Sequence, residues 1–453
     1  MLSEKIRDFE KSNSKSLEEI IWNLCNDYFD YSFQFQEHRD YFFFKNCFSK
    51  ALTVKILNNK EFIELFLSNF NNNRIFYFKS FDEFELAKFY VKDKNIDVKK
   101  TKFNLKLIKL KTALYFLKYF RFKDKDKDKY KDKVIFYCTN KKYKPIFDLC
   151  EKNIKKNKIL YINDIRNDLF KKLSFHLKNN KIYFPSFLKK INSETITNIL
   201  ITYNIVYTFF NKSNFKAIIS VEGDSLEHSI SAYISNNRFK TICFQWGSLT
   251  KNNLKNGFKY MYQNIVFVWS NYYKKKFSEY NPDTKFIING NNLLNFTKKN
   301  KKTDIIFLLN PSEIFISDKT DLEFIKIIRW TKKFINKNII VRFHPAQDPK
   351  KIDYIQNALK KIGIIFHDPK KITLKQSLEN VAVGISARSS SLIEISRLGI
   401  IPVVFNKKEE KLEEFFDHIN KIGHKTESID GVKKILSRIF RSNSNQKKIK
   451  EKI

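Results

Sequence analysis

The sequence predicts an α/β protein in which two tandem Rossmann-like domains follow a helical N-terminal extension. Short, continuous apolar runs alternate with helical stretches from residue 134 onward, which is typical of parallel strands covered on both faces. The alternation restarts after the lysine-rich stretch 297–303. No glycine occurs before Gly223, so the sharp turns and close ligand approaches that need glycine are expected in the later part of the chain.

Residues 1–122 form the predicted helical N-terminal region, which is rich in Phe, Tyr and Leu and contains no glycine. Within it, residues 103–123 place apolar side chains among basic ones. This pattern predicts a basic amphipathic helix that either packs on the next domain or lies on an acidic membrane. Residues 123–133 alternate lysine and aspartate without an apolar face, which indicates a solvated linker.

Two domains with alternating strands and helices are then expected. The first covers residues 134–296, with strands at 134–138, 159–162, 216–221, 241–244, 264–269 and 285–289. The second covers residues 304–406, with strands at 304–309, 338–343, 364–366, 381–385 and 400–405. Residues 407–453 form a basic helical tail. In such folds ligands bind at the carboxyl ends of the strands, and two domains in tandem place a cleft between them.

Composition excludes several classes of protein. An apolar content of 42% is too high for a disordered chain. The net charge of +38 would suit a non-catalytic nucleic-acid or membrane adaptor. The charges are spread along the chain and no nucleic-acid-binding module is recognisable, so we expect no nucleic-acid partner. An acidic membrane surface remains a candidate partner.

The lack of a recognisable targeting signal and the pattern of the cysteines both favour a cytoplasmic location. The N-terminus lacks an apolar signal core, and no run approaches the roughly 20 apolar residues of a membrane span. The sequence therefore predicts a cytoplasmic protein, one that can be peripheral on the inner face of the inner membrane. The five cysteines are scattered and lack metal-site spacing, which favours reduced, buried thiols.

Two segments of the first domain follow predicted strands and carry candidate site residues. Glu222 and Asp224 flank Gly223, and either carboxylate could take a proton from an acceptor hydroxyl. The alternative is a helix cap and a surface ion pair. Gln245, Trp246, Gly247 and Ser248 follow the next strand. This segment either lines the donor and acceptor cleft or is an ordinary turn.

Two segments of the second domain also follow predicted strands. Arg342, His344 and Pro345 end one strand. A histidine there can donate to a phosphate oxygen, and Arg342 is a second candidate for binding the phosphate. A serine-rich helix start follows another strand and offers hydroxyl and amide donors for an anion. Its candidate residues are Ser386, Arg388, Ser389, Ser390, Ser391 and Glu394. A multiply capped helix without a ligand is the alternative.

These segments, in this order, resemble GT-B glycosyltransferases, and most of all bacterial sialyltransferases and polysialyltransferases. Those families carry an acidic-glycine motif, then His-Pro, then a serine pair, matched here by residues 222–224, 344–345 and 389–391. The resemblance implies that the acidic residue is the general base and that His344 contacts the nucleotide phosphate. It also implies that the serines bind phosphate or the donor carboxylate, and that Glu394 holds the ribose. Capsule Kdo transferases and polyol-phosphate transferases share His-Pro and paired serines.

The resemblance thus implies an inverting glycosyltransferase, with residues 134–296 as its acceptor domain and residues 304–406 as its nucleotide-sugar domain. It would move a sialic-acid-like or Kdo-like sugar from a CMP-activated donor to a surface glycan or glycolipid acceptor. No cofactor or metal is expected, because cationic and amide groups can stabilise the leaving phosphate. No Asp-x-Asp pair resembles a sugar-nucleotide metal site, since the pairs at residues 124–128 belong to the charged linker. A polyol-phosphate transferase and a sugar-nucleotide epimerase of the same fold remain alternatives. Glycine separates the two acids here, so both Glu222 and Asp224 stay candidates for the base.

Overall fold

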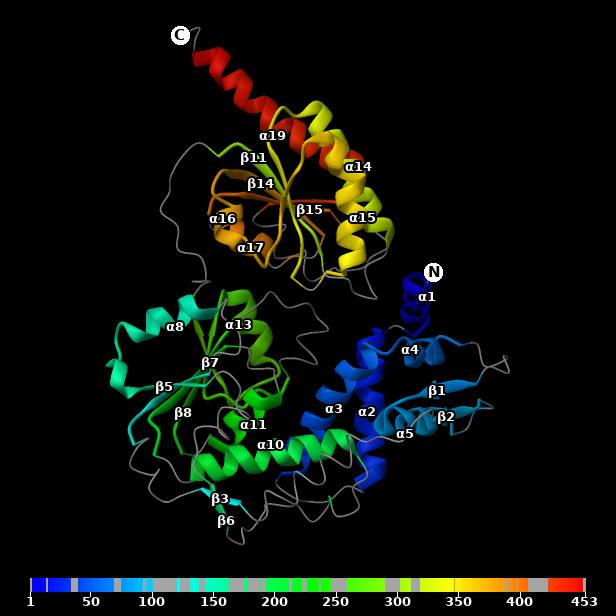
Figure 1. Ribbon diagram of the computed structural model, residues 1–453, viewed down its shortest axis with the longest axis vertical. Coiled ribbons are helices and arrows are strands. Elements are labelled where there is room, and N and C mark those ends of the chain that lie inside the picture. Colours follow the sequence, from blue (N-terminus) through cyan, green and yellow to red (C-terminus); the bar gives the residue numbers. More distant parts are fainter. Residues whose placement is uncertain are drawn as a thin grey trace. The chain divides into compact units, whose positions relative to one another are not determined.

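The computed structural model describes residues 2–13, 15–33, 40–68, 75–92, 94, 96–100, 120–122, 131–137, 143–162, 175–177, 188, 193–211, 214–221, 226–235, 238–245, 259–289, 302–310, 318–345, 347–387, 389, 391–396, 398–405 and 423–450 (Figure 1). The described residues divide into two compact units. The N-terminal unit lies within residues 8–293, and the C-terminal unit comprises residues 302–450 together with residues 2–7.

The N-terminal extension is mainly helical. Its helices are α1 (Leu2–Asn13), α2 (Leu17–Phe33), α3 (Tyr41–Leu57), α4 (Lys60–Phe66) and α5 (Phe81–Tyr90). The sequence did not reveal a small parallel ribbon here, formed by β1 (Phe76–Phe78) and β2 (Val98–Lys100). Three-residue strands carry too little periodicity to be read from a sequence.

The first sheet has six parallel strands in the order β10-β9-β8-β7-β4-β5. The strands are β4 (Val134–Tyr137), β5 (Ile159–Ile162), β7 (Ala217–Val221), β8 (Lys240–Phe244), β9 (Ile265–Val268) and β10 (Lys285–Ile288). Helices α8 (Lys144–Glu151), α10 (Glu194–Asn211), α11 (Leu226–Ser235) and α13 (Asn271–Ser278) and the 3-10 turn η2 (Lys156–Lys158) accompany the strands. All six predicted strands are present, each within a residue or two of the expected bounds.

From residue 8 onward, the extension belongs to the same compact unit as this Rossmann-like layer and packs directly on it. The Phe43 ring of α3 stacks on Tyr233 of α11, with centroids 3.9 Å apart and planes 8° apart. The Tyr233 hydroxyl donates to buried Asp40, just before α3. The buried Asp82 of α5 accepts hydrogen bonds from the Thr195 amide and hydroxyl at the start of α10 (2.8 and 2.5 Å). These contacts join the extension to the sheet domain by buried aromatic and polar groups.

The second sheet has six parallel strands in the order β13-β12-β11-β14-β15-β16. Counted along the chain this is 3-2-1-4-5-6, the order of dinucleotide-binding Rossmann folds. The strands are β11 (Asp304–Leu308), β12 (Ile339–Arg342), β13 (Ile365–His367), β14 (Val381–Ser386), β15 (Ile401–Phe405) and β16 (His424–Thr426).

Helices cover both faces of the second sheet. In Figure 1, α14 (Asp318–Phe334), α15 (Pro349–Leu359) and α19 (Ile429–Lys450) lie on one side, with the 3-10 turn η4 (Lys360–Ile362) after α15. Helices α16 (Leu374–Ser377) and α17 (Ser391–Ser396) lie on the other. The core between them is aliphatic and aromatic, with Ile305, Phe307, Val383 and Val403 fully buried. The predicted α/β fold with two Rossmann-like domains after a mainly helical extension is confirmed.

The C-terminal domain does not end at residue 406. Strand β16 pairs with β15 beyond that boundary, and Val432 and Leu436 of α19 are fully buried in the domain core. The predicted basic tail therefore supplies the last strand and a packed helix of the domain. These residues could not be assigned to the domain from the sequence, because lysines separate the apolar residues of α19 into short runs on one face of the helix.

Two further predictions concern the middle of the chain. The predicted amphipathic helix 103–123 lies outside the described residues except at 120–122, which form β3 (Phe120–Phe122). This strand pairs antiparallel with β6 (Phe175–Leu177), so the predicted helix is wrong at that end. Of the charged linker 123–133, only residues 131–133 are described.

Neither membrane spans nor disulfides are found in the part of the chain that the structure describes. None of its helices combines the length and apolar character that a membrane crossing requires. Cys25, Cys47 and Cys243 are buried free thiols, and Cys150 is a half-buried one. The expected burial therefore holds for three of these four cysteines.

Candidate functional site

The order of the second sheet reverses between β11 and β14. Successive strands are added outward from β11 toward β13 on one side and from β14 toward β16 on the other. At such a switch point the connections leave the carboxyl edge in opposite directions, and open α/β sheets bind ligands there. The residues that follow β11, β12 and β14 therefore define the candidate site of the C-terminal unit.

Ser386 ends β14 and is fully buried, with 0% of its surface exposed. Its hydroxyl donates to the Leu308 carbonyl of β11 at 2.7 Å and lies 3.4 Å from Asn310 Oδ1. The same oxygen accepts a hydrogen bond from the Ser389 amide at 3.3 Å. Ser386 therefore ties the ends of the two switch-point strands together. Its contacts are those of a positioning residue, whereas the sequence predicted a direct phosphate contact.

Ser389 organises the start of α17. Its hydroxyl accepts from the Ser391 amide at 3.3 Å, and its carbonyl accepts from the Leu392 amide at 3.0 Å. Ser389, Ser391 and Glu394 are half-buried, so each retains some access to solvent. The predicted serine-rich segment thus begins at the carboxyl end of a switch-point strand, as expected. Arg388 and Ser390 lie outside the described residues.

His344 lies two residues after β12, in a tight turn. Its amide donates to Gln347 Oε1 at 3.3 Å, and its carbonyl accepts from the Gln347 amide at 3.0 Å. Asp348 then caps α15 by accepting from the Lys350 amide at 2.9 Å. His344 is half-buried and Pro345 is exposed. Because β12 is hydrogen-bonded to β11, His344 stands at the same edge as the switch point.

Arg342 has partners that the sequence did not reveal. Its Nη1 donates to the Ile372 carbonyl and to the Ser377 hydroxyl, both at 2.8 Å. Nδ1 of His367 lies 2.9 Å from the same hydroxyl. Burial lowers the pKa of Arg342, and the charge of Asp368 opposes this effect. Arg342 therefore holds the segment before α16 and the last residue of α16 against β12. These contacts differ from the phosphate contact that the sequence predicted.

His367 and Ser377 are site-edge residues that sequence reasoning missed. In the sequence His367 lies 10 residues before Ser377, and Ser377 lies 35 residues after Arg342. No local sequence pattern connects residues at such separations. Burial lowers the pKa of His367, and the charge of Arg342 lowers it further. His367 therefore favours its neutral form beside the arginine.

In the N-terminal unit, the strands end where the sequence predicted. β7 ends at Val221 and β8 ends at Phe244. Glu222, Gly223 and Asp224 follow the first of these ends, and they lie outside the described residues. The same holds for Trp246, Gly247 and Ser248 after β8. Their candidate roles stay predictions.

Gln245 is the described member of the predicted cleft segment, and it is only 2% exposed. Its Oε1 accepts from the Trp269 amide at 2.9 Å, and its carbonyl accepts from the Trp269 indole at 3.1 Å. Its own amide donates to the Phe267 carbonyl at 2.9 Å. Gln245 therefore joins the carboxyl ends of β8 and β9, and this position differs from the predicted cleft-lining one.

Among the described residues, no group of three or more His, Cys, Asp and Glu side chains is placed to hold a metal ion. The switch-point edge instead presents hydroxyl, amide and imidazole groups, which are donors suited to an anion. The expectation of a metal-independent reaction stays a prediction.

No protein-family model matches the chain, and no curated protein sequence matches it. Among solved structures, it is similar to a UDP-GlcNAc 2-epimerase from Neisseria meningitidis, with 13% identity over 70% of this chain and 93% of that one and a TM-score of 0.46. A putative UDP-N-acetylglucosamine 2-epimerase from Listeria monocytogenes gives 12% identity, 69% and 89% coverage and a TM-score of 0.47. The Gap123 glycosylation-associated complex of Streptococcus agalactiae gives 16%, 53% and 51%, and 0.36. The proposals below rest on this chain's own residues and topology.

Proposed function

We propose that this chain is an inverting glycosyltransferase that uses a CMP-activated acidic sugar, sialic-acid-like or Kdo-like, and a surface glycan or glycolipid as acceptor. The observation that supports it best is the placement of His344 and the serine segment 389–391. They follow β12 and β14, on either side of β11. In a sheet of order 3-2-1-4-5-6 this is the edge where nucleotides bind.

The proposed donor site uses hydrogen-bond donors in place of a metal. The imidazole of His344 and the hydroxyls of Ser389 and Ser391 would contact the CMP phosphate, and Ser386 would hold their loop in place. Pro345 would fix the turn, while Arg388, Ser390 and Glu394 enter the proposal from the motif alone. Donors preorganised around a developing negative charge lower the barrier most when the site is shielded from water.

In the proposed reaction, Glu222 or Asp224 accepts the proton of the acceptor hydroxyl. The oxygen attacks the anomeric carbon, and the bond from that carbon to the CMP phosphate oxygen breaks. CMP leaves with the bonding electron pair. Because the acceptor oxygen attacks the face opposite to the departing phosphate, the configuration at the anomeric carbon inverts. Trp246, Gly247 and Ser248 are the proposed acceptor-side segment, and Gln245 positions it from within the sheet.

The net charge of +38 supports a place of work beside an acidic membrane or an acidic glycan. Basic residues near an anionic lipid surface contribute about 1 kcal/mol each. We therefore propose a cytoplasmic enzyme that acts at the inner face of the inner membrane. Flotation with anionic vesicles, compared with neutral ones, tests this part of the proposal.

The test of the reaction is turnover of CMP-linked sialic acid and Kdo by the purified full chain. Release of CMP and the mass of the product are both measured. Glu222→Gln and Asp224→Asn are made separately, and loss of the true base lowers kcat by about 10²–10⁴. His344→Ala should lower turnover by about 10²–10³ through weaker stabilisation of the leaving phosphate.

Two control variants accompany these changes. His424→Ala removes another half-buried histidine of the C-terminal unit, and Glu279→Gln removes an exposed carboxylate of the N-terminal unit. Both should keep turnover. Unchanged rates in all three test variants would overturn the proposal. A product carrying a polyol phosphate, an epimerised nucleotide sugar without transfer, or salt-sensitive nucleic-acid binding without turnover would instead identify one of the alternatives.

A further inference from the structure

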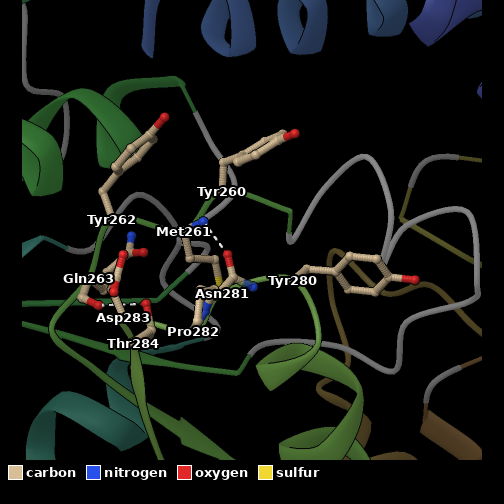
Figure 2. Close-up of a pocket in the computed structure, with 9 residues that line it drawn as sticks. All are labelled: Tyr260, Met261, Tyr262, Gln263, Tyr280, Asn281, Pro282, Asp283 and Thr284. Atoms are coloured by element: carbon tan, nitrogen blue, oxygen red, sulfur yellow. Dashed lines mark hydrogen bonds between the residues drawn. The ribbon is translucent and has the colours of Figure 1, made fainter. Parts of the chain in front are cut away.

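A small pocket lies at the amino ends of β9 and β10 in the first sheet. This is the end of the sheet opposite to the carboxyl ends of β7 and β8, where the predicted reaction segments begin. One wall is the segment that enters β9 and the other is the segment that joins α13 to β10 (Figure 2). Its volume is about 160 Å³. It is lined by Tyr260, Met261, Tyr262, Gln263, Tyr280, Asn281, Pro282, Asp283 and Thr284. Pockets for drug-sized ligands begin at about 300 Å³, so this one suits a single small ring.

Buried hydrogen bonds hold the two walls together. Asn281 Oδ1 accepts from the Met261 amide at 2.6 Å, and its Nδ2 donates to the Phe277 carbonyl at 3.0 Å. The Thr284 hydroxyl donates to the Gln263 carbonyl at 3.0 Å. Figure 2 shows the first and last of these bonds bridging the walls. A ligand that enters does not need to order the pocket, and preorganisation of this kind favours binding.

Tyr260 has an unusual backbone. Its φ is 63°, in the left-handed region, which is unfavourable for a residue with a bulky side chain. The side chain is 38% exposed, and Lys259 Nζ lies 5.0 Å from the ring centroid. Strained residues of this kind cluster at binding sites, where the surrounding structure maintains them. Tyr260 is thus an accessible aromatic residue in the lining of the pocket.

The lining chemistry selects the class of ligand. Tyr260 offers an apolar ring face with a polar hydroxyl, and Asp283 offers an exposed carboxylate that accepts hydrogen bonds. Asp283 is also the one acidic or basic side chain among the nine that line the pocket. A carboxylate attracts the hydroxyls of a neutral sugar and repels the carboxylate of an acidic sugar or a phosphate.

We propose that this pocket binds one neutral pyranose unit of a glycan. The apolar face of the sugar ring packs on Tyr260, and vicinal hydroxyls donate to Asp283. The pocket stands at the edge of the sheet opposite to the ends of β7 and β8, so it is a second sugar site, separate from the reaction site. Its use as an anchor for an extended acceptor glycan rests on the proposed function, whereas the binding itself does not.

Saturation-transfer NMR with the full chain tests the proposal without any donor. The probes are the methyl glycosides of glucose, galactose, mannose and N-acetylglucosamine, with N-acetylneuraminic acid as the anionic probe. We expect at least one neutral glycoside to bind, and N-acetylneuraminic acid to bind about ten-fold more weakly or not at all. Because the readout is binding, failure here leaves the transferase proposal standing, and the converse also holds.

Two variants assign the signal to the pocket. Tyr260→Gly removes the ring and adopts the same φ without strain, so the melting temperature should stay or rise while affinity falls about ten-fold. Asp283→Asn should weaken binding similarly. Tyr207→Ala, which removes a tyrosine of like exposure (36%) from α10, is the control and should keep affinity. The absence of neutral-sugar binding, binding unchanged in both pocket variants, or tighter binding of the anionic sugar would each overturn the proposal.

Discussion

Gly384 of β14 lies directly against Ile395 of α17. A Cβ built on Gly384 would fall 2.2 Å from Ile395 Cδ1 and 3.6 Å from Ile306 Cγ2. Gly384 lies inside the six-residue strand, away from any turn. Its role is to let α17, which starts with the candidate serine segment, pack closely on the sheet. Gly399 does serve a turn, with a φ of 67° between α17 and β15.

The Gly384→Ala variant should lower the free energy of unfolding by about 1–3 kcal/mol, the range for overpacking a tight core. The added methyl group forces Ile395 Cδ1, which is fully buried, to move. Chemical denaturation of the purified variant measures the loss.

Ile395→Val supplies the matched control for this change. Alone it should cost about 0.5–1.5 kcal/mol, because it removes one buried methyl group. Combined with Gly384→Ala it should cost less than the sum of the two, because the clashing atom is gone. Additive losses would contradict direct contact between the two positions.

Arg342→Lys should destabilise the C-terminal unit by about 1.5–3 kcal/mol, the range for hydrogen bonds to a charged group. A lysine cannot reproduce the two bonds that Nη1 donates to Ile372 and Ser377. Arg329→Lys, which loses a single exposed bond to the Ala358 carbonyl, should change stability less. Unaltered stability combined with loss of CMP binding would instead restore the phosphate contact predicted from the sequence.

Stability should decline as the solution is acidified below about pH 6.5. Burial lowers the pKa of both His367 and His424 from 6.5, and the nearby Arg342 and Arg438 lower them further. Below pH 6.5 these two histidines therefore bind protons in the unfolded chain more readily than in the folded chain. As pH falls through their folded pKa values, the free energy of unfolding decreases.

The melting temperature between pH 7.5 and 5, about the range over which histidines titrate, measures this effect. A double variant, His367→Asn with His424→Gln, should show a shallower decline than the natural sequence, because neither replacement titrates. Identical pH dependence in the two proteins would show that other groups cause the decline.

Thiol labelling should divide the cysteines by burial. Burial raises the pKa of Cys25 and Cys47 to about 12, so both should resist alkylation at pH 8 until the chain unfolds. The pKa of Cys150 is raised as well, but its half-exposed thiol should react earlier than theirs. Mass spectrometry of the labelled peptides resolves each cysteine. Rapid labelling of Cys25 in the native protein would contradict the packing of α2 on α3.

Much of the fold could be predicted because parallel strands buried on both faces are continuous apolar runs. β7, β11 and β14 are examples, and each was expected within a residue or two. β16 was missed because His424, Lys425 and Thr426 contain no apolar residue. It is an edge strand that pairs through its backbone, which leaves no mark on side-chain patterning.

The positions of the candidate site segments could also be predicted from the sequence. His344, Ser389 and Ser391 follow strands, and the order of those strands brings them to one edge. The individual roles were not predictable in the same way. Ser386 and Gln245 are polar residues at strand ends, where ligand-binding residues are expected. Both are buried, however, and their hydrogen bonds join neighbouring strands.

By itself the sequence determined the class of the fold, the positions of the strands of the two six-stranded sheets except β16, and the loops that can carry chemistry, because these depend on local patterns of apolar and turn residues. Only the tertiary structure decided which polar groups have partners already. The bonds of Arg342 to Ser377 and of Asn281 to Met261 join segments that are distant in the chain. Such pairings arise from packing, since a buried donor must find an acceptor wherever the fold brings one.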